Sequence, residues 1–183
     1  MPKKIATWAN LITLVRLILS FPFYYFLWHI ESKGIFPAIL LGSVLILTDL
    51  ADGYTARARN EITKFGAVFD AVLDKVIVDA ALLILILKQY IILWWVIPLF
   101  ARDIFLGIAG LILLIRSGDA IKTIISGKLT PVLWSLVMAA LLLQKTGVAK
   151  VSMIIANMFV IISWINYGRI WYRNIKKGSI ADV

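Results

Sequence analysis

Long apolar runs follow one another along nearly the whole chain, and they constrain its fold more than any other feature of the sequence. Hydrophobic residues make up 62% of the 183 residues and charged residues only 16%, so the chain lacks the polar side chains with which a soluble domain covers its surface. A helix needs about 20 apolar residues to cross a bilayer, and the runs are of that length. We therefore predict an all-α integral membrane protein that forms a single domain over residues 1–183.

Six of the runs are long enough to be transmembrane helices. They cover residues 11–30, 35–56, 66–87, 91–115, 129–145 and 148–172. The segment from Pro2 to Trp8, which contains Lys3 and Lys4, is too short to span and is predicted to form a short N-terminal interfacial helix against anionic headgroups. No cleavage pattern of a secretory signal follows the first run, so we expect the N-terminus to be retained.

Basic residues are distributed unequally between the predicted loops. Twelve of the 19 lysines and arginines fall at the two termini or in the loops after the second and fourth runs. The loops on the other side contain only Lys33, Lys88, Lys145 and Lys150. Because cytoplasmic loops accumulate basic residues, we expect a multi-pass protein of the cell membrane with both termini in the cytoplasm. The net charge of +9 then reflects topology and contact with anionic membrane lipids, and it requires no nucleic-acid partner.

Four aspartates lie near the cytoplasmic ends of two of these apolar runs. A charged aspartate at the centre of a spanning helix costs about 2.5 to 3.5 kcal/mol on insertion scales, so such a cluster indicates a functional site. Asp49 and Asp52 are three residues apart at the end of the second run. On the third run, a glycine and two aspartates repeat every four residues, namely Gly66, Asp70 and Asp74. Since residues three or four apart share a helix face, each run presents its carboxylates on one side.

The two runs are consecutive, and the polar loop over residues 57–65 allows them to pack antiparallel with the carboxylates in one pocket on the cytoplasmic side. Four anions in one pocket repel one another unless a cation lies between them. The chain has no cysteine, and its single histidine, His29, is at the far end of the first run. Oxygen ligands alone select a hard cation such as Mg²⁺, Mn²⁺ or Ca²⁺, and the spacing fits neither an EF-hand nor a P-loop.

The pattern Asp-x2-Asp-Gly-x2-Ala-Arg-x8-Gly-x3-Asp-x3-Asp, which runs from Asp49 to Asp74, resembles the signature of the CDP-alcohol phosphotransferase family. Every fixed position of that signature is met. The resemblance implies a membrane enzyme of phospholipid biosynthesis with six transmembrane helices and a cytoplasmic active site. It would transfer a phosphatidyl or archaetidyl group from a CDP-linked lipid to an alcohol and release CMP, with one or two Mg²⁺ or Mn²⁺ ions neutralising the pyrophosphate.

The family pattern also implies roles for single residues. The expected metal ligands are Asp49, Asp52, Asp70 and Asp74. Asp74 is in addition the expected general base, which takes the proton of the acceptor hydroxyl. The residues expected to contact the CDP-linked lipid are Asp52, Gly53, Ala56, Arg57 and Gly66. The glycines and the alanine lack bulk and let the nucleotide approach the helix backbone.

Three basic residues near cytoplasmic helix ends are candidates for binding an acceptor phosphate, namely Arg102, Lys128 and Arg169. Arg102 is equally consistent with a buried ion pair, because Asp103 follows it. Lys128 comes just before Pro131, which we expect to open a helix.

Within the family, three further segments resemble phosphatidylglycerophosphate and cardiolipin synthases. They are Asn10 to Arg16, Gly127 to Thr130 and Ser163 to Tyr167, and the last two match imperfectly, with Pro131 where a threonine is often found. Glycerol 3-phosphate is therefore the first choice of acceptor, with phosphatidylglycerol or inositol phosphate as alternatives. Because relatives often pair, the resemblance also suggests a homodimer.

A small cation transporter is the alternative from a different functional class. It would account for the intramembrane charges Arg16, Asp79, Arg102 and Asp103. Transporters usually contain an internal repeat, whereas the acidic motif occurs once here, so we favour the enzyme.

Overall fold

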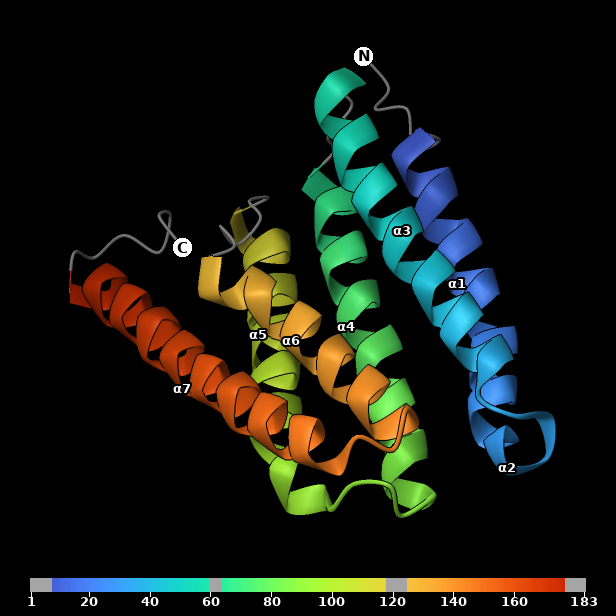
Figure 1. The fold of residues 1–183 in the computed structure, drawn as a ribbon. Helices are drawn as coiled ribbons and strands as arrows, with labels where there is room; N and C mark the ends of the chain where they lie inside the picture. Colours follow the sequence, from blue (N-terminus) through green and yellow to red (C-terminus); the bar gives the residue numbers. More distant parts are fainter. Residues whose placement is uncertain (1–7, 60–63, 118–124, 177–183) are drawn as a thin grey trace. The chain divides into compact units, whose positions relative to one another are not determined.

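The computed structural model describes residues 8–59, 64–117 and 125–176. All regular structure in these residues is helical, which confirms the predicted all-α class. The elements are α1 (Trp8–Trp28), α2 (Ile30–Lys33), α3 (Phe36–Arg59), α4 (Lys64–Leu87), the 3-10 turn η1 (Leu93–Trp95), α5 (Ile97–Ser117), α6 (Ile125–Leu142) and α7 (Thr146–Lys176) (Figure 1).

Each of the six long helices falls on one of the six apolar runs, and the boundaries differ by a few residues. The predicted loop over residues 57–65 is wrong in extent, because α3 continues to Arg59 and α4 already begins at Lys64. The sequence from Ala56 to Arg59 alternates alanine and arginine, which both favour helix. Helix α5 begins only at Ile97, since Pro98 suits the first turn of a helix and η1 precedes it. The predicted interfacial helix over Pro2 to Trp8 lies outside the described residues, apart from Trp8, which begins α1.

Among the residues that the structure describes, one helical segment, Thr146–Arg169, is long and apolar enough by length and composition to cross a membrane. Shorter apolar segments occupy Leu14–Trp28, Phe36–Thr48 and Leu129–Leu142. The six predicted spans are thus six helices in the structure, while their crossing of a membrane stays a prediction.

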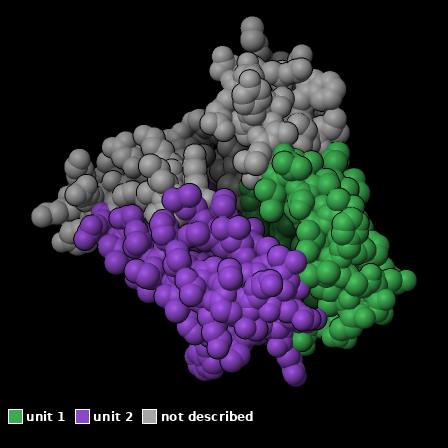
Figure 2. Space-filling view, in the orientation of Figure 1, with its two compact units in different colours: residues 1–88 green, residues 89–183 purple. Residues whose placement is uncertain are grey.

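The chain divides into two compact units, residues 1–88 and residues 89–183 (Figure 2). In the first unit, α1 packs against both α3 and α4. Small residues let α1 approach α3 closely: Ala38 is fully buried, and a Cβ atom on Gly42, one turn further, would lie 3.3 Å from the Phe23 ring. On α4, buried apolar residues recur every four positions, at Leu73, Ile77, Ala81 and Leu85, and Leu82 is buried beside them. This face of α4 therefore forms part of the core.

In the second unit, α7 packs along α6 and also contacts α5 (Figure 1). The buried face of α7 recurs every three or four residues, at Ala149, Met153, Ala156, Val160, Ser163 and Tyr167. Across from it, α6 buries Thr130, Trp134 and Val137. Polar groups also enter this core, from Thr130 in the first half of α6 and from Ser163 and Tyr167 in the second half of α7.

Candidate active site

The fixed positions of the acidic motif lie on helical backbone. Asp49 and Asp52 are near the end of α3, and Gly66, Asp70 and Asp74 are in the first half of α4. Residues three or four apart in a helix share a face, so the helical backbone supports the predicted grouping of the aspartates of each helix. The side chains of seven motif residues lie outside the described part of the structure: Asp49, Asp52, Gly53, Ala56, Arg57, Gly66 and Asp70.

Asp74 is the motif residue whose tertiary contact the structure gives. Its Oδ1 atom accepts a hydrogen bond from Nη1 of Arg16, and the two side chains form an ion pair between α1 and α4. The Arg16 side chain is 2% exposed and the Asp74 side chain 30% exposed. The pair joins a fully buried cation to a carboxylate that keeps part of its surface open.

Arg16 is a residue that the sequence analysis did not connect to the motif. The signal was present, because an arginine inside an apolar run needs a carboxylate partner. Arg16, Ser20 and Tyr24 also repeat every four residues and make a polar stripe along α1. The Tyr24 hydroxyl donates to the Ile77 carbonyl on α4 at 3.2 Å, so this stripe faces α4.

A second polar cluster surrounds Arg102 in the core of the unit formed by residues 89–183. Nε of Arg102 donates to Ser163 Oγ at 3.1 Å, and Nη2 donates to the Gly127 carbonyl at 3.2 Å. Nη1 lies 3.1 Å from Asp103 Oδ1, in an ion pair without hydrogen-bond alignment. Arg102 is 1% exposed, so the buried ion pair considered for Arg102 and Asp103 is present.

This cluster unites the sequence segments that match the family imperfectly. Arg102 comes from α5, Gly127 from the first turn of α6, and Ser163 and Tyr167 from α7. Their contacts are far apart in the sequence, and no local pattern predicts them. The guanidinium group holds three helices together at one point.

Pro131 does not open a helix as predicted, because α6 begins at Ile125 and contains Pro131. Proline has no N–H group to donate to the carbonyl four residues earlier, which here belongs to Gly127. That carbonyl accepts the hydrogen bond from Arg102 instead. The arginine therefore satisfies a backbone acceptor that the proline leaves without its helical partner.

Gly127 is also required by a close contact with α7. A Cβ atom at this position would lie 2.8 Å from the Tyr167 hydroxyl and 3.4 Å from Nη2 of Arg102. A separation of 2.8 Å is below any normal carbon–oxygen contact, so a larger residue must displace Tyr167 or α6. Because Gly127 has no side chain, the first turn of α6, which contains Lys128, can lie this close to α7.

We expect Gly127→Ala to destabilise the protein by about 1 to 3 kcal/mol, the usual cost of overpacking. Tyr167→Phe removes the oxygen that the new methyl group would strike. In the Tyr167→Phe background, Gly127→Ala should therefore lower the free energy of unfolding much less than it does in the wild-type background. Chemical unfolding in detergent micelles would measure both values. Equal costs of the alanine in the two backgrounds would contradict this contact.

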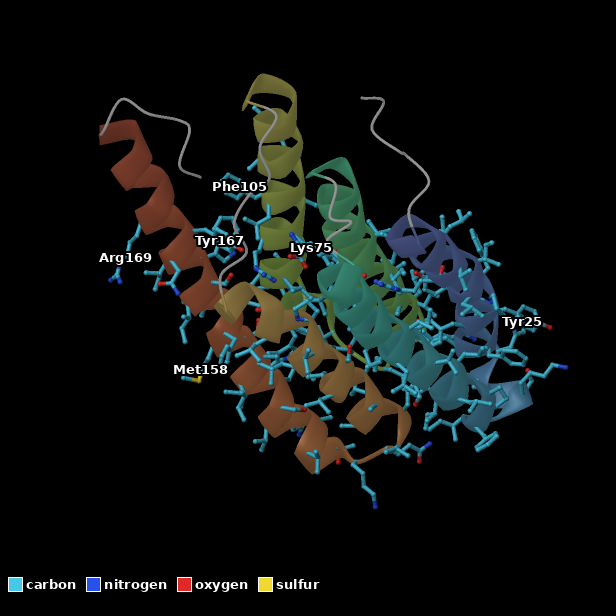
Figure 3. All side chains as sticks on the ribbon, turned by 90° about the horizontal axis from the view of Figure 1, so that it is seen from above. Tyr25, Lys75, Phe105, Met158, Tyr167 and Arg169 are labelled. Carbon is cyan, nitrogen blue, oxygen red and sulfur yellow. The ribbon has the colours of Figure 1, made fainter. Side chains whose placement is uncertain are left out.

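The other two acceptor candidates are not placed beside Arg102 by the described contacts. The side chain of Lys128 lies outside the described residues, and Arg169 is exposed on α7. Figure 3 shows Arg169 pointing away from the helices, on a different side of α7 from Tyr167 two residues before it. A role for Lys128 and Arg169 at the acceptor therefore stays a prediction.

A sequence profile of the CDP-alcohol phosphatidyltransferases matches residues 6–165, which include the acidic motif, Arg16 and the whole Arg102 cluster except Tyr167. The chain belongs to the CDP-alcohol phosphatidyltransferase family. It is thus a transferase of phospholipid biosynthesis, and the family is membrane-bound. The alternative of a cation transporter is set aside.

Two similar proteins carry the same name. The CDP-diacylglycerol–glycerol-3-phosphate 3-phosphatidyltransferase of Bacillus subtilis (strain 168) is 29% identical over 174 residues, which cover 88% of this chain and 89% of that protein. The protein of that name from Escherichia coli (strain K12) is 37% identical over 102 residues, which cover 54% of this chain and 55% of that protein. The first match extends over nearly the whole length of both proteins.

Enzymes of this family are generally metal-dependent, and the donor chemistry of the transferase fits a hard divalent cation. The four motif aspartates offer only oxygen ligands, as Mg²⁺ and Mn²⁺ prefer. Among the side chains that the structure describes, no three His, Cys, Asp or Glu residues form a metal-binding group. The side chains of Asp49, Asp52 and Asp70 are not among them, so of the four motif aspartates this finding covers Asp74 alone.

Proposed function

We propose that this transferase moves a phosphatidyl group from CDP-diacylglycerol to glycerol 3-phosphate, forming phosphatidylglycerophosphate and releasing CMP. The observation that carries the proposal is the similarity to the Bacillus subtilis enzyme along 89% of that protein's length. The complete acidic motif on α3 and α4 supports the reaction class. The choice of glycerol 3-phosphate as acceptor is based on the similarity to the Bacillus subtilis enzyme and on the chemistry of the Arg102 cluster.

In the proposed reaction, the primary hydroxyl of glycerol 3-phosphate attacks the phosphorus of the phosphatidyl group. The new bond joins that oxygen to the phosphorus, and the bond from phosphorus to the CMP oxygen breaks. Asp74 accepts the proton of the attacking hydroxyl. The Asp74 side chain is 30% exposed, so part of its carboxylate surface is open to an acceptor.

The remaining aspartates, Asp49, Asp52 and Asp70, would hold one or two Mg²⁺ or Mn²⁺ ions together with Asp74. When bound, the ions supply positive charge that neutralises the pyrophosphate. Gly53, Ala56 and Gly66 would leave space for the nucleotide, and Arg57 would pair with its phosphate. These assignments follow the family pattern and the helical register of the motif.

Arg102 is the proposed anchor for the phosphate of the acceptor, with Lys128 and Arg169 as further contacts. Two of its nitrogens donate aligned hydrogen bonds within the protein, whereas Nη1 makes an unaligned ion pair. In the part of the chain that the structure describes, Nη1 has no hydrogen-bond partner, so it retains donor capacity for a phosphate oxygen. Arginine suits this role because its fork of N–H groups matches a phosphate.

The proposed membrane arrangement has six transmembrane helices, with both termini and the active site on the cytoplasmic side. The six long helices and the uneven distribution of lysine and arginine support it. The lipid tails of the donor would then stay in the bilayer while the pyrophosphate lies at the headgroup level. A homodimer is part of the proposal by likeness to the family.

We expect purified protein to release CMP from CDP-diacylglycerol when glycerol 3-phosphate and Mg²⁺ are supplied. The assay would compare glycerol 3-phosphate with inositol phosphate, serine and phosphatidylglycerol as acceptors. Chelation of divalent ions should stop the release, and added Mg²⁺ or Mn²⁺ should restore it. A second donor with ether-linked chains tests the lipid specificity.

Release with a different acceptor would keep the reaction class and replace glycerol 3-phosphate. Release that persists after complete chelation would contradict the metal assignment of the motif. A folded sample that releases no CMP with any donor and acceptor would contradict the proposed function.

A further inference from the structure

The geometry points to Arg16 as a positioning residue for Asp74, a role that rests on the proposed function of Asp74 as the base. Nη1 of Arg16 donates to Oδ1 of Asp74 across the interface of α1 and α4. Arg16 is 58 residues from Asp74 in the sequence and lies outside the acidic motif. Helix α1, on which Arg16 lies, contains none of the fixed positions of the motif.

The burial of Arg16 indicates that its charge serves a specific contact inside the protein and does not merely mark the cytoplasmic side. Its side chain is 2% exposed, although arginine is almost never fully buried unless it is paired. An arginine that served only to mark the cytoplasmic side would lie at the helix end with its head in water or among lipid headgroups. Arg16 instead lies eight residues inside α1, and its guanidinium contacts the carboxylate of the motif.

The two ends of the pair differ in exposure, and this difference favours a positioning role. Asp74 remains 30% exposed, so one side of its carboxylate is held while part of its surface stays accessible. The planar guanidinium group is rigid and directional, and a hydrogen bond to Oδ1 restricts the rotation of the carboxyl group. A base that must meet an acceptor hydroxyl at hydrogen-bond distance benefits from such a restriction.

If Arg16 served only to hold α1 against α4, removing another polar contact between these helices should affect the rate as removal of Arg16 does. Tyr24 lies two turns after Arg16 on the same stripe, and its hydroxyl donates to the Ile77 carbonyl on α4 at 3.2 Å. Tyr24→Phe removes one hydrogen bond between α1 and α4 without touching the motif. It is therefore a matched control for Arg16→Gln.

The first measurement needs no substrate. Unfolding midpoints of wild type, Arg16→Gln, Asp74→Asn and the double variant, all without metal, form a cycle that tests the pair. If the two side chains interact, the double variant should be less destabilised than the sum of the single variants, because each single change already breaks their shared contact. Additive midpoint shifts would overturn the pairing.

The second measurement is steady-state CMP release with both substrates varied. We expect Arg16→Gln to lower kcat by about 10²-fold, the effect of misplacing a reacting group, while each KM stays within about threefold. Arg16→Lys should recover part of kcat, because it keeps a cation without the rigid fork. Tyr24→Phe should keep kcat within about twofold of wild type while lowering the unfolding midpoint.

A kcat of Arg16→Gln within twofold of wild type, or an equal loss in Tyr24→Phe, would overturn the positioning role. Absence of CMP release by wild-type protein with glycerol 3-phosphate would instead count against the proposed function. In that case, the unfolding cycle still confirms or overturns the contact between Arg16 and Asp74, so the two failures are distinguishable.

Discussion

Asp74→Asn should lower the rate of CMP release by about 10²- to 10⁴-fold, the usual contribution of a general base. Asparagine keeps the shape of the side chain but cannot accept a proton from the acceptor hydroxyl. The amide also lacks the negative charge that pairs with Nη1 of Arg16, so the ion pair between α1 and α4 is lost. The rate would be followed as CMP release under saturating CDP-diacylglycerol and glycerol 3-phosphate.

Asp79→Asn provides the control for this experiment. Asp79 lies on the same helix, five residues after Asp74, and is also partly buried, but it is outside the acidic motif. If the loss of rate in Asp74→Asn came only from removing a charge from α4, Asp79→Asn would show a similar loss. We expect it to retain at least about a third of the wild-type rate, since no proton transfer depends on it.

Arg102→Met should lower the free energy of unfolding by about 3 to 5 kcal/mol, because it removes the cation that lies 3.1 Å from the buried carboxylate of Asp103. The same change removes the hydrogen bonds to Ser163 Oγ and to the Gly127 carbonyl. Since Pro131 cannot supply an N–H group to that carbonyl, α6 has no local replacement for the lost donor. Chemical unfolding in detergent micelles would measure this loss of stability.

A second variant separates the structural role of Arg102 from binding of the acceptor. Arg102→Met combined with Asp103→Asn removes both charges, and replacing both partners of a buried pair is much less costly than removing one. This double variant should recover much of the stability, while its KM for glycerol 3-phosphate stays at least about tenfold above the wild-type value. Recovery of both stability and KM would contradict a role of Arg102 at the acceptor phosphate.

The position of the acidic motif could be predicted from the sequence because its information is local. Hydropathy located six helices within a few residues, and a spacing of three and four residues is enough to place aspartates on one helix face. The errors occurred where local signals compete. Pro131 usually marks a helix start, but here a distant arginine compensates for its missing N–H group, and the helix continues through it.

The sequence by itself determined the all-α class, the reaction class and the place of the four aspartates on two helices, since each depends on composition or on residues close together in the chain. Only the tertiary structure decided which partners the buried charges have. Arg16 contacts Asp74 from a helix outside the motif, and Arg102 joins α5, α6 and α7 through Gly127 and Ser163. A buried charge requires a partner wherever the packing brings one, and packing depends on helix contacts that sequence spacing does not encode.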